Sequence, residues 1–166
     1  PDLLEVLYGI FCGYSPGERN GGFWTQPVFS NHNGNFSCKT GYVYFTLAAE
    51  KFPDKVPPLT ATQIEALDFF QEIANRPDFH FSMMFQPGDL QLLNNHVMLH
   101  ARSDFEDYEE EDQKRHLFRL WLSVPNSRPL SPLMQDVYRD IRPGVTRGGY
   151  PTTHGRIVYH SNASMD

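Results

Sequence analysis

The sequence predicts a mainly β domain with flanking helices. Apolar and polar side chains alternate over Phe79–Phe85 and again over Arg115–Leu122, which is the period of strands with one buried face. Asn33-Gly34 lies between two apolar runs and is a strong hairpin signal. The capping box Thr60-Ala61-Thr62-Gln63, followed by apolar residues at helical spacing, predicts a helix that ends near Asn75.

The first third of the chain supplies shorter elements. Asp2–Tyr8 predicts one or two turns of amphipathic helix that end at Gly9. Cys12–Gly22 is rich in glycine and other turn residues, so we expect a loop there. The two strands of the Asn-Gly hairpin are expected at Phe23–Asn31 and Asn35–Thr40.

The middle of the chain continues with a short helix over Gly41–Lys51, which must end before Pro53. Pro87-Gly88-Asp89 is a turn that leads into an apolar strand at Leu90–Leu99. Ser103–Gln113 is acidic and lacks apolar periodicity, so it is expected to be a solvated loop.

Beyond Ser123, three prolines end the strand region near Val124. Leu133–Ile141 predicts a short helix, with four apolar or aromatic residues expected to face inward. These residues are Leu133, Val137, Tyr138 and Ile141. Arg142–Thr153 is expected to cross the surface, and Ile157–Tyr159 to add a short edge strand.

Composition excludes several classes of protein. The chain has 166 residues, enough for one domain with a buried core, and a formal net charge of −6 without any Lys/Arg-rich run. We therefore expect no nucleic-acid partner, and no apolar run is long enough to predict a membrane partner. Cys12 and Cys38 are too few for a disulfide scaffold, and no signal peptide is apparent, so free thiols and a cytoplasmic location are expected.

The stretch from Gln86 to Ser123 carries the chemistry. On a strand at Arg115–Leu122, one face would hold Arg115 and Arg119 beside Leu117 and Trp121. Two cations on the face of so apolar a strand need anionic partners. The structural alternative for Arg115 is an ion pair with the acidic residues 109–112, which are close in sequence.

The segment LNNHVMLHAR, the acidic loop and RHLFRLWL together resemble the C-terminal motif of the TauD/TfdA-like Fe(II)- and 2-oxoglutarate-dependent dioxygenases. The resemblance extends weakly to the PDLLEVLYG start and the FQPGD turn. It implies the C-terminal half of a double-stranded β-helix, the clavaminate synthase-like jelly roll. By the same resemblance, His100 is an Fe(II) ligand, Arg115 binds the far carboxylate of 2-oxoglutarate, and Arg119 binds an anionic group of the substrate.

The activity implied by this resemblance is oxidation or hydroxylation of a small organic substrate. In the family, O2 is the co-substrate, and the reaction is coupled to decarboxylation of 2-oxoglutarate to succinate. Two histidines and one carboxylate are a common set of ligands for such iron, because they leave positions open for the keto acid and O2. The alternative is an iron-free jelly-roll binding module or pseudo-enzyme.

The family's first two ligands, His-x-Asp or His-x-Glu, are missing from this sequence. None of the seven histidines is followed two places later by a carboxylate. We therefore expect residues 1–166 to be the C-terminal part of a single domain whose N-terminal part, with that motif, is absent, and to be inactive alone. The structure should then show an incomplete barrel with exposed strand edges, or a second chain that completes it.

Two further groups of residues are given structural roles. His96 and His100 would lie about 13 Å apart on one strand, too far for a shared ion, so His96 is expected near the mouth of the site or on the surface. The carboxylates Glu65, Asp68 and Glu72 lie on the predicted helix and are expected to form a solvated face.

Overall fold

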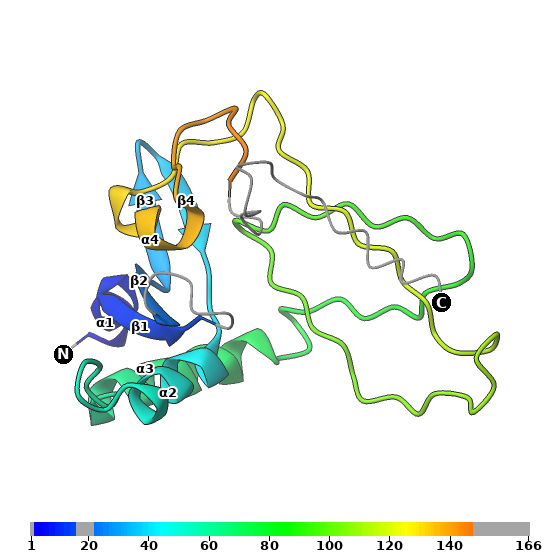
Figure 1. Cartoon of the computed structure of the whole chain (residues 1–166), viewed down its shortest axis with the longest axis horizontal. Helices are drawn as coiled ribbons and strands as arrows, with labels where there is room; N and C mark the ends of the chain where they lie inside the picture. The colour runs from blue at the N-terminus through cyan, green and yellow to red at the C-terminus, as the bar shows by residue number, and fades with distance from the viewer. Residues whose placement is uncertain (1, 16–21, 148–166) are drawn as a thin grey trace.

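The computed structural model describes residues 2–15 and 22–147 (Figure 1). Two small antiparallel sheets and several helices form its folded body, and a long extended segment reaches away from that body. The elements are α1 (Leu3–Tyr8), β1 (Ile10–Tyr14), β2 (Phe23–Pro27), β3 (Phe29–His32), β4 (Asn35–Cys38), α2 (Tyr42–Lys51), α3 (Ala61–Ala74), the 3-10 helix η2 (Pro132–Met134) and α4 (Gln135–Tyr138).

The predicted first helix is confirmed as α1, and Asp2 caps it by accepting a hydrogen bond from the Leu4 amide at 2.9 Å. The loop predicted from Cys12 is wrong at its start, because β1 runs to Tyr14 and pairs with β2. Gly13, within the range predicted to be a loop, lies in β1 opposite Trp24. A Cβ at Gly13 would be 2.2 Å from the indole ring, so close packing explains the glycine.

The Asn-Gly hairpin is confirmed as β3 and β4, with positive φ at Asn33 (52°) and Gly34 (76°). The single strand predicted over Phe23–Asn31 is wrong, because Val28 separates β2 from β3 and the two strands join different sheets. Pro27 has no N–H with which to continue a ladder, and this favours the break.

Helices α2 and α3 confirm two predictions. At the start of α3, the Gln63 amide donates to Thr60 Oγ1 at 3.2 Å, and the Thr60 amide donates to Gln63 Oε1 at 3.0 Å. This is the reciprocal capping box that the sequence predicts.

The core lies where these helices meet the small sheets. α2 packs on β1 and α1 packs on α3 (Figure 1). The buried residues of this core are Leu7, Phe11, Val28, Cys38, Phe45, Ala66 and Leu67. The rings of Phe11 and Phe45 contact each other in a tilted arrangement, with centroids 5.1 Å apart, so aromatic packing joins β1 to α2 in the core.

The strands predicted at Phe79–Phe85, Leu90–Leu99 and Arg115–Leu122 are wrong. Residues 75–131 contain turns and extended segments but no helix or strand. Neighbouring residues, which would lie on opposite faces of a strand, are both open: Met83 is 51% and Met84 82% exposed, and Leu120 is 78% and Trp121 62% exposed. Alternation indicates which face a strand would bury, but a strand also needs a neighbouring backbone and an apolar layer to cover it. The described residues supply neither for these segments.

The predicted helix over Leu133–Ile141 forms in part, as η2 and α4, and ends at Tyr138. The expected inward position of Leu133 is wrong: it is exposed, and Met134 is buried instead. The 3-10 turn at Pro132 changes the angular spacing of the side chains, which explains the shift by one residue. The predicted strand at Ile157–Tyr159 lies outside the described residues.

The cysteines and the helices bear on two expectations drawn from the composition. Cys12 and Cys38 are free thiols, as predicted. Among the helices of the described ranges, none is long and apolar enough to cross a membrane.

Candidate functional site

The residues implied by the resemblance lie on the extended segment. His100, Arg115 and Arg119 are all exposed and lie outside any helix or strand. No sheet forms there in the described ranges, so the shared strand face predicted for Arg115 and Arg119 is absent.

Arg115 is positioned by two local contacts. Its backbone amide donates to Asp107 Oδ1 at 2.7 Å. Its guanidinium carbon lies 5.2 Å from the centroid of the Phe105 ring, and that of Arg102 lies 4.7 Å from the same centroid. Phe105 therefore holds two guanidinium groups through cation–π contacts.

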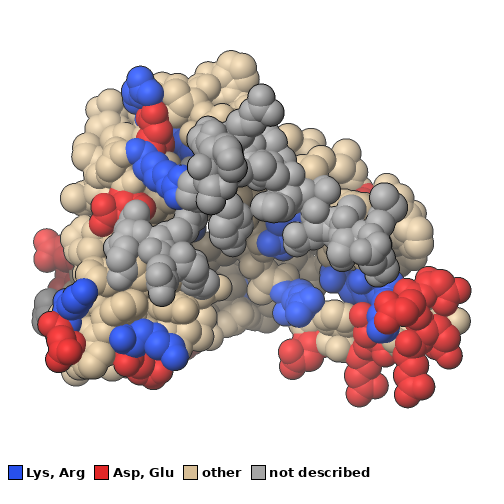
Figure 2. Space-filling view, in the orientation of Figure 1, with Lys and Arg blue, Asp and Glu red and all other residues tan. Residues whose placement is uncertain are grey.

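The acidic residues gather at the far end of the extended segment. Figure 2 shows these carboxylates as one mass beside a smaller group of Lys and Arg side chains. Residues 104–112 supply seven of them and are exposed, as expected for a solvated loop. The alternative ion pair between Arg115 and residues 109–112 is not present in the part of the chain that the structure describes; Glu111 pairs with Lys114 instead.

A complete iron centre is not formed by the described residues. Within them, no three His, Cys, Asp or Glu side chains come together in a way that could hold a metal ion. His100 therefore belongs to no such group of three within residues 2–15 and 22–147. The described chain does not by itself fit Fe(II), which needs further ligands.

His96 differs from its expected position. It lies in a turn rather than on a strand, is half-buried, and its ring centroid lies 5.6 Å from that of Tyr138. Burial, together with the positive charges of Arg147, Arg128 and Lys39, lowers the pKa of His96 to about 4. Sequence reasoning missed this cluster, because its members come from distant parts of the chain.

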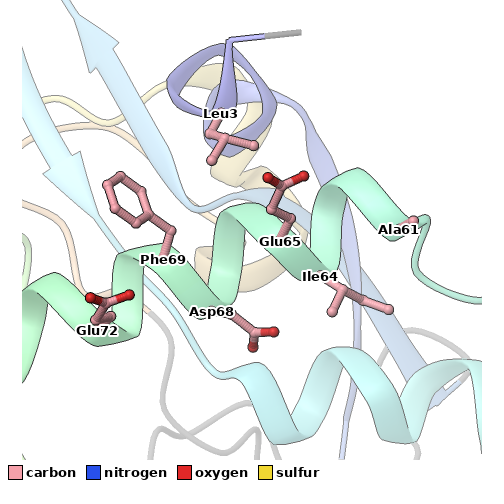
Figure 3. A pocket seen from close by; sticks show the side chains of 7 residues that line it. All are labelled: Leu3, Ala61, Ile64, Glu65, Asp68, Phe69 and Glu72. Atoms are coloured by element: carbon pink, nitrogen blue, oxygen red, sulfur yellow. The ribbon is translucent and has the colours of Figure 1, made fainter.

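The carboxylates of α3 form a solvated face, as predicted. Glu65, Asp68 and Glu72 line a shallow depression together with Leu3 and Phe69. Figure 3 shows the three carboxylates spread along the helix and not converging on one point. This arrangement is unsuited to holding one ion.

Comparison with known proteins identifies the family. The family model described as "Taurine catabolism dioxygenase TauD, TfdA family" matches residues 1–121. The chain belongs to the TauD/TfdA family. The matched range includes His100, Arg115 and Arg119.

Two curated relatives agree with this membership. The chain is similar to FR-33289 synthase of Streptomyces rubellomurinus, with 39% identity over 77% of this chain and 39% of that protein. It is also similar to the taurine hydroxylase-like protein SAT17 of Stachybotrys chartarum, with 32% identity over 72% of this chain and 31% of that protein. The chain thus spans between about a third and two fifths of the length of these relatives.

Proposed function

We propose that this chain is the C-terminal part of a non-haem Fe(II)- and 2-oxoglutarate-dependent dioxygenase that oxidises a small organic substrate. The observation that carries the proposal is the family match over residues 1–121, which includes every residue singled out by the motif. Fe(II), when bound, would supply the oxidising chemistry with O2, coupled to the decarboxylation of 2-oxoglutarate to succinate. His100 would supply one iron ligand, with the others coming from residues outside this chain.

In this proposal Arg115 binds the far carboxylate of 2-oxoglutarate. A guanidinium is always charged and presents a planar fork of donors, which suits a carboxylate better than an ammonium does. The Phe105 ring and the Asp107 contact restrict the position of Arg115, while its exposed head leaves donors accessible. Arg119 would bind an anionic group of the substrate.

We further propose that the extended segment 79–124 forms strands only when it pairs with the remainder of the same domain. Apolar side chains are exposed at both alternating sets of positions, including Phe118 (76% exposed) and Trp121 (62% exposed). Such surfaces are unfavourable in water and open to aggregation. The greater length of the curated relatives supports a covering part that belongs to the same polypeptide.

The test is His100→Ala in the full-length protein, with His116→Ala as the matched control. We expect His100→Ala to lose most bound Fe(II) and succinate release, and the control to keep both. Iron is measured by metal analysis of protein reconstituted under anaerobic conditions, and succinate by chromatography with 2-oxoglutarate, ascorbate and candidate substrates.

The same measurements distinguish the alternative function. Wild-type protein that binds no Fe(II) and releases no succinate would overturn the dioxygenase proposal and favour an iron-free binding module. Equal losses in the two variants would remove the ligand role from His100.

A further inference from the structure

Several cations lie near His96, and none of them is a residue used in the proposed function. The Lys39 ammonium lies 5.6 Å from the centroid of the Tyr138 ring, whose other neighbour is the His96 ring. Arg128 reaches the same region and donates a hydrogen bond to the Phe36 carbonyl oxygen. The end of β4, the turn at His96 and the end of α4 therefore meet at one place.

Arg147 is fixed in this cluster by main-chain carbonyl groups. Its Nη2 donates to the carbonyl oxygens of Arg128 at 2.5 Å, Ile141 at 3.1 Å and Arg142 at 2.5 Å, and its Nε donates to Arg142 at 3.0 Å. These bonds hold the guanidinium rigidly. Its Nη1 is buried and has no hydrogen-bond partner among the residues that the structure describes. A buried, charged donor that is held in place and unpaired needs an acceptor.

Ion pairs between described residues do not neutralise these three cations. None of the ion pairs within the described residues includes Lys39, Arg128 or Arg147. The negative charge of Asp140 interacts electrostatically with Arg147, but the Asp140 carboxylate forms its ion pair with Arg142, at 2.6 Å. Three cations thus face His96, and burial and their repulsion keep its imidazole neutral.

We propose that Lys39, Arg128 and Arg147 form a binding site for a small oxyanion, a carboxylate or phosphate group, with Arg147 Nη1 as its central donor. A guanidinium and an ammonium bind oxyanions through charge-assisted hydrogen bonds. Burial raises the pKa of Tyr138 to about 12, so its hydroxyl stays protonated and can donate as well. This inference uses neither His100 nor Arg115 and does not depend on the dioxygenase proposal.

The test follows the His96 ring by NMR in the full-length protein, with chloride as the only other anion. Inorganic phosphate is added at constant ionic strength. We expect phosphate to raise the midpoint of His96 titration by at least one pH unit, because its negative charge offsets the three cations. Arg147→Gln should raise the phosphate concentration needed for half of this effect at least tenfold, and Arg147→Lys should raise it by less. Arg76→Gln, a remote exposed arginine, should leave it unchanged.

Two sources of the oxyanion give different results. If a carboxylate of the protein itself fills the site, the midpoint of His96 titration in the wild type is already well above 4 without phosphate, and adding phosphate does not change it. In that case Arg147→Gln changes the chemical shifts of the His96 ring even when no phosphate is present. A wild-type midpoint near 4 that phosphate does not move would overturn the proposal. An equal phosphate effect in wild type and Arg147→Gln would overturn it too, since that is general screening.

Discussion

The amide of Cys38 donates a hydrogen bond to the carbonyl oxygen of His96, with an N···O distance of 2.7 Å. This bond joins the end of β4 to the extended segment that leads to His100. It fixes the main chain at His96, so the imidazole stays beside Tyr138 and the cations around it. The protonation of His96 is therefore coupled to the contact between the folded body and the segment proposed to bear the iron ligand.

Stability should depend on pH through His96. Its folded pKa of about 4 lies below the ordinary value of 6.5. Between these values the unfolded chain binds more protons, so stability is full above pH 6.5 and falls as the pH drops towards 4. The expected loss is on the order of 1 to 3 kcal/mol. Urea unfolding of the full-length protein at pH 7 and pH 5, in amine buffers with chloride, measures it.

His96→Gln should remove this part of the pH dependence, since glutamine does not titrate. His80→Gln is the control, because His80 is exposed and its Nδ1 contacts only the Arg76 carbonyl, at 3.0 Å. An unchanged slope in His96→Gln would assign the acid sensitivity to other groups.

Sequence signals that are satisfied within a few residues predicted the local structure. The Thr60–Gln63 box and the Asn33-Gly34 turn each form their contacts locally, and both are confirmed. Strand formation at Phe79–Phe85 depends on a neighbour that the local pattern does not specify. Gly13 shows a different limit: the same residue type serves a turn or a close contact, and only the pairing with Trp24 distinguishes the two.

The candidate site was predictable to the same extent. The motif that resembles the family singled out His100 and Arg115. A local motif does not indicate which residues, distant in sequence, would complete a site with them. The cluster of Lys39, His96 and Arg147 carries no spacing signal at all, because its members are brought together only by the folding of three separate segments.

The core should be sensitive to loss of volume at α3. Leu67 is 1% exposed and belongs to the main apolar cluster. Leu67→Ala should lower the free energy of unfolding by about 2 to 5 kcal/mol, because it removes buried methyl groups and leaves a cavity. Ile64→Ala, on the same helix but 40% exposed, should cost less than about 1 kcal/mol. Urea denaturation compares the two, and equal losses would contradict this packing.

The two thiols should differ in reactivity. Burial raises the pKa of Cys38 to about 11 and also raises that of Cys12, which is less buried. At pH 8 the Cys38 thiolate fraction is roughly a hundredfold below that of an ordinary thiol, because two pKa units separate them. Iodoacetamide should therefore modify Cys12 first and Cys38 only after unfolding in urea, as followed by peptide mass spectrometry. Rapid modification of Cys38 in the native protein would show that β4 opens readily.

The last prediction concerns Arg115 and uses Arg102 as its matched control. Both guanidinium groups contact the same Phe105 ring, so a change to lysine disturbs similar packing at each position. Only Arg115 is proposed to bind the far carboxylate of 2-oxoglutarate. Arg115→Lys should raise the KM for 2-oxoglutarate by about 10- to 100-fold, the equivalent of one lost charged hydrogen bond of about 1.5 to 3 kcal/mol. Arg102→Lys should change it less than about twofold.

A second keto acid separates binding of the carboxylate from a general loss of structure. 2-Oxobutanoate lacks the far carboxylate, so it has nothing for Arg115 to hold. The ratio of kcat/KM for 2-oxoglutarate to that for 2-oxobutanoate should fall in Arg115→Lys and stay constant in Arg102→Lys. If Arg115→Lys lowers both values by the same factor, the arginine supports the fold of the segment and does not contact the keto acid.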